Sequence, residues 1–345
     1  MNITKYNGLI SQNIAPYGAT AIGIYNKQNN KVGEFSLQGL KLPYLGKKLY
    51  SFGAISDVHI TYDTAQEDFK KALIFLNETE DVDFTCICGD LTASGTSSEL
   101  ETYISYVNNY SSDTPVFEVA GNHECYDMIL PFEGISQYTG HNLYYSFTQG
   151  NDVFIMFGMQ NYNTGVSAAE QEPFSQEALQ WLYETLEENR NKRCIVFQHC
   201  LRFDGSGSPY NSYMTVSLLS NTKGSVFKSL MEHYKNVVWF HGHSHMKFDC
   251  QEDADYANYD RKFGCHSIHI PSLAVPRDYA NDVYVAKYAE SEGYIVDMYE
   301  NHIVLRGRDF VKEKFLPIAT YCIDTTLQNI EAKTYTDSTG TITTV

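Results

Sequence analysis

The chain has 345 residues, of which 43% are hydrophobic, and a formal net charge of −17 at pH 7. This length allows a sizeable buried core, and no apolar run approaches the roughly 18 residues of a membrane helix, which excludes a transmembrane span. The acidic balance disfavours nucleic acids and anionic membranes as partners, because proteins hold these polyanions with Lys and Arg. The net charge does not exclude a small phosphorylated substrate.

Residues 1–48 contain two short β-like runs, Ala19–Tyr25 and Lys31–Leu37, on either side of an Asn-rich turn. Such a pair of runs about a polar turn predicts a β-hairpin. We expect a small N-terminal β accessory element over residues 1–48, ahead of a main domain over residues 49–318. The first residues lack the basic-then-apolar order of a signal peptide, so we also expect a cytoplasmic protein.

The main domain alternates strand-like and helix-like segments. Five apolar runs are typical of buried strands: Tyr50–Ser56, Phe84–Cys88, Pro115–Ala120, Cys194–Gln198 and Val237–Phe240. Apolar residues at helical spacing predict helices over Asp63–Asn77, after a capping box of Thr96 and Glu99, from Ser175, and over Gly224–Tyr234. Strands that alternate with helices in this way indicate an α/β fold.

The remaining segments are expected to be loops and C-terminal strands. Residues 201–223 are rich in Ser, Gly and Asn, which predicts a loop of the kind that shapes substrate access. Gly293–Met298 and His302–Arg306 predict a β-hairpin that closes the core. We expect residues 319–345 to form a tail or an edge strand. The eight cysteines form no Cys-x-x-Cys pair, so we expect buried free thiols.

Each of the five strand-like runs is followed by side chains that bind metals. In chain order they are Asp57, His59, Asp90, Asn122, His199, His243 and His245. Because ligands of an open α/β sheet bind beyond the carboxyl ends of its strands, we expect these side chains at one edge of one sheet. They exceed the needs of one tetrahedral ion, and their chemistry suits Mn, Fe, Zn or a similar metal. The sequence therefore predicts two divalent or transition metal ions, with Asp90 placed to bridge them.

Simpler explanations exist for each residue taken alone. A His at a strand end is more often a hydrogen-bonding residue than a ligand, and Gly89-Asp90 or Gly121-Asn122 alone would be a turn signal. These explanations would all have to hold at once, which argues against them. His241 belongs to none of the blocks, and for it a structural role is favoured over one in support of the metals.

The blocks also carry a family resemblance. Asp57-x-His59, Gly89-Asp90, Gly121-Asn122-His123-Glu124, His199 and Gly242-His243-x-His245 resemble, in the same order, the motifs of the calcineurin-like metallophosphoesterases. The resemblance covers Ser51 to His245 and implies a four-layer α/β/β/α sandwich with two sheets between helices. It implies Asp57, His59 and His245 at one metal, Asn122, His199 and His243 at the other, and Asp90 between them. His123 would then stand near the leaving group.

The form of the second block narrows the resemblance. Gly89-Asp90-Leu91-Thr92 is more similar to the bacterial branch with cyclic-nucleotide and glycerophosphodiester phosphodiesterases than to purple acid phosphatases or protein serine/threonine phosphatases. Glu124 departs from that branch, which usually has Asp there. We expect hydrolysis of small phosphodiesters by in-line attack of a metal-bridging hydroxide, with Asn122 on the phosphoryl oxygens and His123 as the acid. The alternatives are a phosphomonoesterase of the same fold, a nuclease, and a non-catalytic binding protein that retains the metal site.

Two arginines are candidate substrate contacts. Arg202 lies in the loop directly after His199, and Arg277 follows the strand-like run Cys265–Ile270. Either could reach a substrate phosphate. For Arg202 the alternative is a solvated loop residue, and for Arg277 it is an ion pair with Asp278 or another neighbour.

Overall fold

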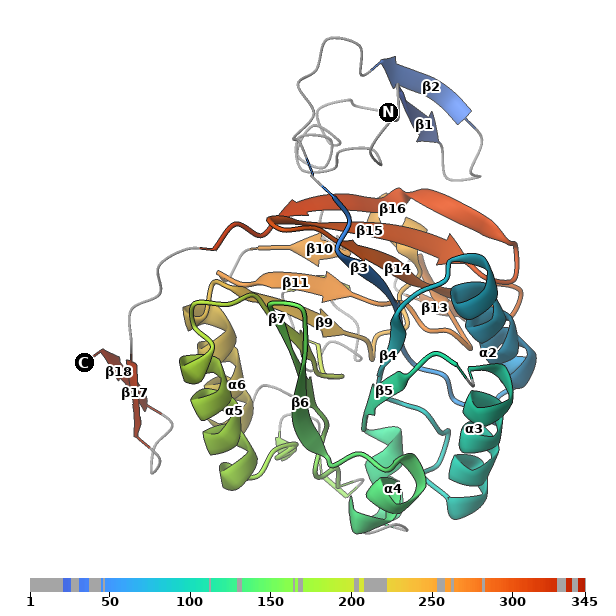
Figure 1. The fold of residues 1–345 in the computed structure, drawn as a ribbon. Helices are drawn as coiled ribbons and strands as arrows, with labels where there is room; N and C mark the ends of the chain where they lie inside the picture. The colour runs from blue at the N-terminus through green and yellow to red at the C-terminus, as the bar shows by residue number, and fades with distance from the viewer. Residues whose placement is uncertain are drawn as a thin grey trace.

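A computed structural model describes residues 21–25, 31–36, 45, 47–111, 113–128, 132–163, 165–166, 170–201, 205–207, 222–252, 258–261, 264–280, 283–327, 333–336 and 341–344. Two six-stranded sheets form its centre (Figure 1). The first sheet has the order β16 (Lys314–Asp324), β15 (His302–Asp309), β14 (Glu292–Met298), β3 (Tyr50–Ile55), β4 (Phe84–Cys88) and β5 (Val116–Val119). The second has the order β10 (Tyr259–Asp260), β11 (His266–His269), β9 (Val237–His241), β8 (Cys194–Phe197), β7 (Asp152–Phe157) and β6 (Tyr144–Gln149).

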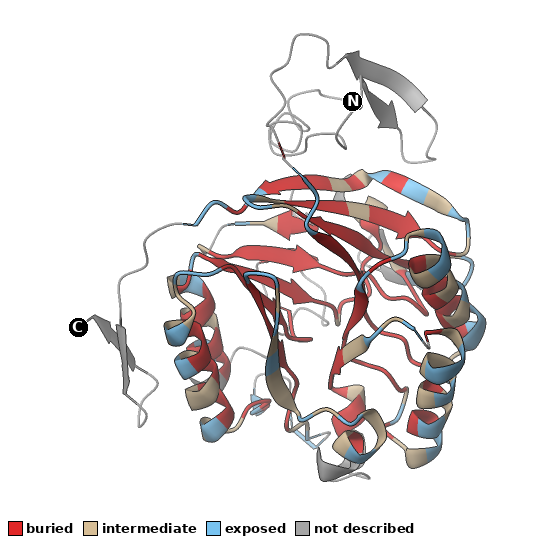
Figure 2. Ribbon diagram, in the orientation of Figure 1, coloured by how far each residue is buried: buried red, intermediate tan, exposed pale blue. Residues whose placement is uncertain are grey.

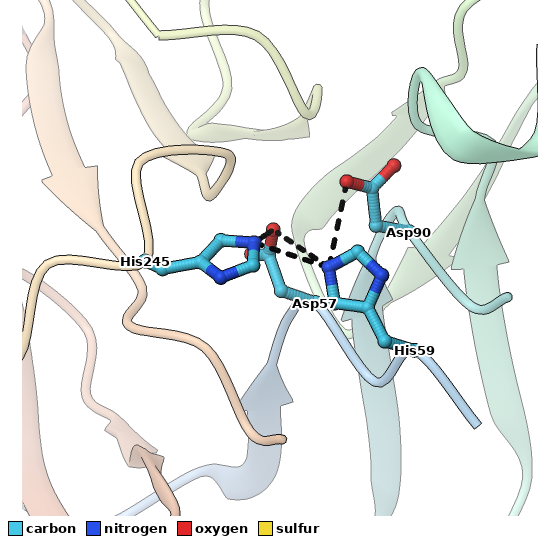
Figure 3. A group of neighbouring side chains, drawn as sticks. All are labelled: Asp57, His59, Asp90 and His245. Carbon is cyan, nitrogen blue, oxygen red and sulfur yellow. Dashed lines mark hydrogen bonds and ion pairs between the residues drawn. The ribbon is translucent and has the colours of Figure 1, made fainter. Parts of the chain in front are cut away.

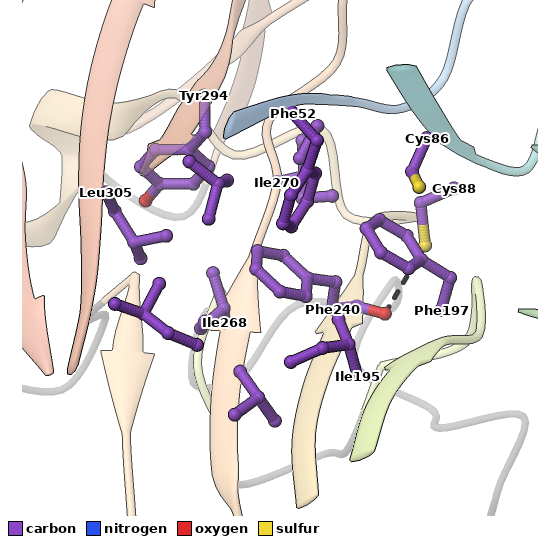
Figure 4. Packing of buried hydrophobic residues seen from close by; sticks show 14 of the residues in the cluster. Phe52, Cys86, Cys88, Ile195, Phe197, Phe240, Ile268, Ile270, Tyr294 and Leu305 are labelled. Carbon is purple, nitrogen blue, oxygen red and sulfur yellow. Dashed lines mark hydrogen bonds between the residues drawn. The ribbon is translucent and has the colours of Figure 1, made fainter. Parts of the chain in front are cut away.

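The two sheets pack on each other through a core of large aromatic side chains. Phe52 of β3 stacks on Phe84 of β4 at 5.4 Å, and its ring also lies 6.0 Å from that of Phe240 in the other sheet. Figure 4 shows this contact layer, to which Tyr294 and Leu305 also belong. Because strands of both sheets are buried on two faces, they read as continuous apolar runs rather than as alternating patterns.

Helices cover the outer face of each sheet, as the α/β pattern predicts. On the first sheet lie α2 (Ala65–Ile74), which continues as one π-helical turn over Phe75–Thr79, and α3 (Ser97–Tyr110). On the second sheet lie α5 (Gln176–Glu188) and α6 (Thr222–His233), while α4 (Phe132–Thr139) lies beside α3. Figure 2 shows that the helix faces turned to the sheets are buried. The four-layer sandwich is therefore confirmed.

The local signals for two helix starts are also confirmed. Thr96 caps α3 in a capping box, because its side chain accepts from the Glu99 backbone while the Glu99 side chain accepts from the Thr96 backbone. Ser175 caps α5 by accepting from the backbone N–H of Ala178. These contacts satisfy N–H groups that the first helical turn leaves without partners.

The expected position of the ligands on one sheet is wrong. Strands β3, β4 and β5 pair in parallel in the first sheet, whereas β8 and β9 pair in parallel in the second. The carboxyl ends of both sets of strands nevertheless meet, because the two sheets face each other. The ligand blocks therefore converge from two sheets across their junction, and not along one edge.

The chain ends form small hairpins. As predicted near the N-terminus, β1 (Ala21–Tyr25) pairs with β2 (Lys31–Ser36), and β1 lies beside β16. The hairpin of β14 and β15 joins the first sheet through β3, and β16 extends that sheet across the expected boundary between residues 318 and 319. Of the expected C-terminal tail or edge strand, residues 319–324 belong to β16, which is the edge strand of the first sheet. Nearer the C-terminus, β17 (Lys333–Thr336) and β18 (Thr341–Thr344) pair only with each other among the described strands.

Two general expectations can be compared with the structure. All eight cysteines are free thiols, and seven of them are buried, whereas Cys250 is half-buried. Among the described residues, no helix is both long and apolar enough to cross a membrane.

Candidate metal centre

The backbone at the ligand blocks adopts a conformation that is uncommon for residues other than glycine. Five of the predicted ligands have a positive φ: Asp57 (53°), His59 (40°), Asp90 (52°), His243 (73°) and His245 (58°). A left-handed residue with a side chain costs on the order of 1–3 kcal/mol and persists only where the surrounding structure enforces it. Such residues concentrate at functional sites, so their coincidence with the blocks points to a site at the strand ends.

Two glycines of the blocks allow the loops to approach closely. A Cβ atom at Gly121 would lie 2.2 Å from Oδ1 of Asp90, and one at Gly242 would lie 2.4 Å from Oδ2 of Asp57. Any side chain at either position would displace a carboxylate of the site. These glycines are therefore required by packing against the candidate ligands.

A first group of candidate ligands consists of Asp57, His59, Asp90 and His245, all buried (Figure 3). Each offers one ligand atom, and these atoms lie within 4.8 Å of one another. Nε2 of His245 is 2.9 Å from Oδ1 of Asp57 and 3.1 Å from Nε2 of His59. Nε2 of His59 is 3.8 Å from Oδ2 of Asp90. Two carboxylates and two imidazoles thus point at one volume.

A second group consists of Asp90, His199 and His243 and shares Asp90 with the first. Nε2 of His199 is 3.1 Å from Oδ2 of Asp90. Asn122 adds an amide oxygen, because its Oδ1 lies 2.8 Å from Nδ1 of His243. All seven predicted ligands therefore come together, in two groups that meet at one carboxylate.

Backbone carbonyls orient the imidazole rings. Nδ1 of His59 is 3.2 Å from the Thr92 carbonyl oxygen, and Nδ1 of His199 is 2.6 Å from the Cys88 carbonyl oxygen. A carbonyl only accepts, so each Nδ1 carries the proton and donates. Nε2, which faces the carboxylates, is then the nitrogen left for a ligand role, an arrangement typical of metal-binding histidines.

The electrostatics of the site fit a bound cation. Burial acts to lower the pKa of His199, yet the charges of Asp90 and Asp57 raise it to about 10. The carboxylates thus draw a positive charge to this point. Among the described residues, Oδ1 of Asp57 accepts no well-directed hydrogen bond, although a histidine nitrogen lies 2.9 Å away. Carboxylate, amide and imidazole donors without thiolates suit divalent transition metals, so the residues present fit the metals that the sequence predicts.

Two further histidines, His123 of the third block and His241, which belongs to none of the blocks, have other surroundings. The backbone N–H of His123 donates to Oδ1 of Asp90 at 2.9 Å, and its Nδ1 donates to the Ala93 carbonyl oxygen at 2.6 Å. Its Nε2 lies 3.8 Å from Oδ2 of Asp90, at the border of the two groups and outside both. His241 is fully buried, and its Nε2 lies 2.9 Å from Oγ of Ser206 and 3.2 Å from Oγ of Ser267, as a structural role requires.

Of the two candidate arginines, only Arg277 lies within the described part of the chain. It opens β12 (Arg277–Ala280), which pairs with β13 (Val283–Ala286), and its backbone N–H donates to the His245 carbonyl oxygen at 2.6 Å. Burial and, to a smaller extent, the Arg277 charge lower the pKa of His245. Arg277 therefore adds positive charge beside the first group. Asp278 is paired with Lys287 at 3.6 Å, and Arg202 lies outside the described residues.

The role of Glu124 was not evident from the sequence, in which this residue is only a departure from a family pattern. This side chain is buried and accepts three hydrogen bonds of 2.8 Å, from N and Oγ1 of Thr92 and from N of Gly121. It thereby ties the loop after β4 to the loop after β5. The first of these loops supplies the carbonyl oxygens that hold the rings of His59 and His123.

Fold and site together define a class of protein: an α/β sandwich with buried Asp/His groups suited to metals at the junction of its sheets. Residues 50–247 match the family model for the calcineurin-like phosphoesterases, and the chain belongs to this family. The family resemblance is confirmed, while the bacterial phosphodiesterase branch stays a prediction.

Two solved structures are similar to the chain at 12% identity and a TM-score of 0.37 each. Vacuolar protein sorting 29 from Cryptosporidium parvum covers 81% of this chain and 100% of its own, and Vps29 from Chaetomium thermophilum covers 81% and 97%. No curated protein gives a significant match.

Proposed function

We propose that this chain is a dinuclear-metal-dependent phosphoester hydrolase that acts on small phosphodiesters. The observation that carries the proposal is the pair of buried ligand groups that share Asp90. Two bound ions would supply Lewis acidity toward a phosphoryl group and a nucleophile at neutral pH. Membership of the calcineurin-like phosphoesterase family supports this chemistry.

The proposal assigns the ligands by their proximity. Asp57, His59 and His245 would hold one ion, because Oδ1 of Asp57 lies within 4 Å of Nε2 of both histidines. Asp90 would be shared, because its Oδ2 lies 3.8 Å from Nε2 of His59 and the residue also belongs to the second group. The second ion would take His199, His243 and the amide oxygen of Asn122. The identity of the metals among Mn, Fe and Zn is left to elemental analysis.

His123 is the proposed proton donor. Its Nδ1 is committed to the Ala93 carbonyl oxygen, so only Nε2 can exchange a proton with a substrate. That nitrogen lies 3.8 Å from the shared carboxylate, and the side chain is 16% exposed. It would thus be close to a phosphate held at the shared carboxylate and reachable by a leaving alkoxide, which a protonated imidazole would neutralise. Asn122 would meanwhile hold a phosphoryl oxygen.

A substrate panel tests the proposal. Protein loaded with Mn, Fe or Zn should turn over bis-nitrophenyl phosphate and small cyclic or glycerol-type diesters better than phosphopeptides or DNA. The net charge of −17 supports this order, because a chain of phosphates would meet a repulsive field. Phosphomonoesters that exceed every diester tenfold in kcat/KM, about 1.4 kcal/mol in transition-state free energy, would reverse the substrate class. No turnover with any metal would leave a binding protein.

A further inference from the structure

Five aromatic rings form a continuous row across the candidate site. The ring centroids of Tyr162 and Tyr126 are 5.1 Å apart, those of Tyr126 and His123 4.3 Å, those of His123 and His59 4.5 Å, and those of His59 and Tyr62 4.6 Å. The two histidines in the middle belong to the proposed machinery. Tyr62 at one end, and Tyr126 and Tyr162 at the other, have no role in the proposed hydrolysis.

The end formed by Tyr126 and Tyr162 lies next to the proposed proton donor. Tyr126 belongs to the 3-10 helix η2 (His123–Met128), and Tyr162 follows β7. Both side chains are half-buried, so part of each ring stays accessible. Burial and then the charge of Asp90 raise the pKa of both hydroxyls, which agrees with their position close to the shared carboxylate. The Tyr126 ring lies 4.3 Å from the ring of His123, so the two tyrosines would border the proposed place of the leaving group.

The arrangement of the two rings indicates what they bind. Their planes meet at 55° and their centroids are 5.1 Å apart, so the rings contact each other and enclose no space between them. Each half-buried ring can take a flat group against its accessible part, and a flat group gains more contact there than a compact tetrahedral head group. The Tyr126 hydroxyl accepts a hydrogen bond of 2.9 Å from Nδ2 of Asn122, which fixes the ring beside the second group of candidate ligands.

We propose that Tyr126 and Tyr162 form an aromatic subsite for the ester group that projects past His123. The preferred substrates would then be phosphoesters of planar groups, either aryl or nucleoside esters, instead of glycerol-type esters. This inference rests on the proposed function, because it places the phosphate at the shared Asp90 and the leaving oxygen at His123. Stacking of a base or aryl ring on tyrosine strengthens binding without hydrogen-bond readout of the ring.

Phosphonates provide a test that does not depend on turnover, since their carbon–phosphorus bond resists hydrolysis. Calorimetric titration of the metal-loaded protein, at a pH where both phosphonates are dianions, compares phenylphosphonate with cyclohexylphosphonate, which has the same head group and similar size but no flat ring. A second pair compares the phosphonate analogue of a purine nucleoside monophosphate with the same analogue lacking its base. We expect the planar member of at least one pair to bind about tenfold more tightly than its partner. A preference in the first pair would indicate aryl esters, and a preference in the second would indicate nucleoside esters.

Variants of Tyr162 connect the preference to this surface, since the Tyr162 ring lies against the Tyr126 ring and two rings away from His123. Tyr162→Leu should reduce the tenfold preference to less than threefold, whereas Tyr162→Phe should retain it. Tyr110→Leu is the matched control. Tyr110 is the last residue of α3, and only the opposite end of this helix, at Ser97, lies near the site. It should leave the preference unchanged.

The outcomes separate the two proposals. Equal binding of the planar and non-planar members of both pairs, or an unchanged preference in Tyr162→Leu, would overturn the aromatic subsite and leave the hydrolase proposal intact. Failure of the metal-loaded protein to bind any phosphonate would count against the proposed function itself and, with it, against the subsite. A choline-type phosphonate is titrated as well, because tyrosine rings also bind quaternary ammonium groups. If it binds more tightly than phenylphosphonate, the proposal that the subsite prefers planar groups is wrong.

Discussion

Replacement of Glu124 by glutamine tests how the site is held in shape. The two side chains have the same size, but glutamine offers one acceptor oxygen instead of two. Its oxygen can still accept from N and Oγ1 of Thr92, which both bond Oε1 of the glutamate. Its amide NH₂ would then face the backbone N–H of Gly121, which now donates to Oε2 at 2.8 Å. Two donors would oppose each other in a buried place.

The expected loss follows from these three contacts. Glu124 is 2% exposed, so water cannot replace the lost acceptor. A buried donor without a partner costs about 1–3 kcal/mol, and the two bonds that remain lose their charge assistance. We expect the free energy of unfolding of Glu124→Gln to fall by about 2–4 kcal/mol. Because the Thr92 loop also holds the rings of His59 and His123, kcat should fall about 10–100-fold with both metals retained.

The assay combines urea unfolding, metal analysis and kinetics on one diester at a temperature where all variants are folded. Glu118→Gln is the matched control, because Glu118 is also a buried glutamate but lies on β5 and contacts His141 at 2.7 Å. It should lose stability without the same loss in kcat. If Glu124→Gln and Glu118→Gln had equal kcat, the idea that Glu124 positions the catalytic loop would be refuted.

Three further predictions concern the metals, the acid and the core. Purified active protein should contain two transition metals per chain and lose activity on chelation, and Asp90→Ala should be the most damaging ligand change; at most one metal equivalent would contradict the dinuclear proposal. His123→Ala should keep both metals but lose roughly 10²–10⁴-fold on esters with poor leaving groups and far less on nitrophenyl esters; equal losses would mean that His123 only positions substrate. Arg193→Met should lower the free energy of unfolding by about 3–5 kcal/mol, since it removes the guanidinium that bonds the buried Asp152 carboxylate at 2.6 and 2.8 Å and leaves that charge with the Tyr50 hydroxyl as its hydrogen-bond partner. A loss under about 1 kcal/mol in urea titration would contradict that account.

The location of the site could be predicted from the sequence because its main signals are local. His59 lies four residues after the last residue of β3, and Asp90 lies two residues after β4, so each ligand is tied along the chain to the end of a strand. Apolar runs, capping residues and turn glycines act within a few residues of each other, and a single sequence carries them completely. The α/β class, the helix starts at Thr96 and Ser175, and the identity of the candidate ligands followed from such signals, whereas the division of the ligands between two metals came from the family resemblance.

The tertiary structure decided the features that depend on distant pairing. An apolar run does not state which strand it pairs with, so the division of the ligand strands between two sheets was not visible in the sequence. The role of Glu124 depends on Thr92, which is 32 residues away. The aromatic row joins Tyr162, which follows β7 of the second sheet, to Tyr62, which follows β3 of the first. Such contacts arise only when loops from different strands meet in space, because hydrogen bonding and ring packing act over a few ångströms and leave no spacing pattern along the chain.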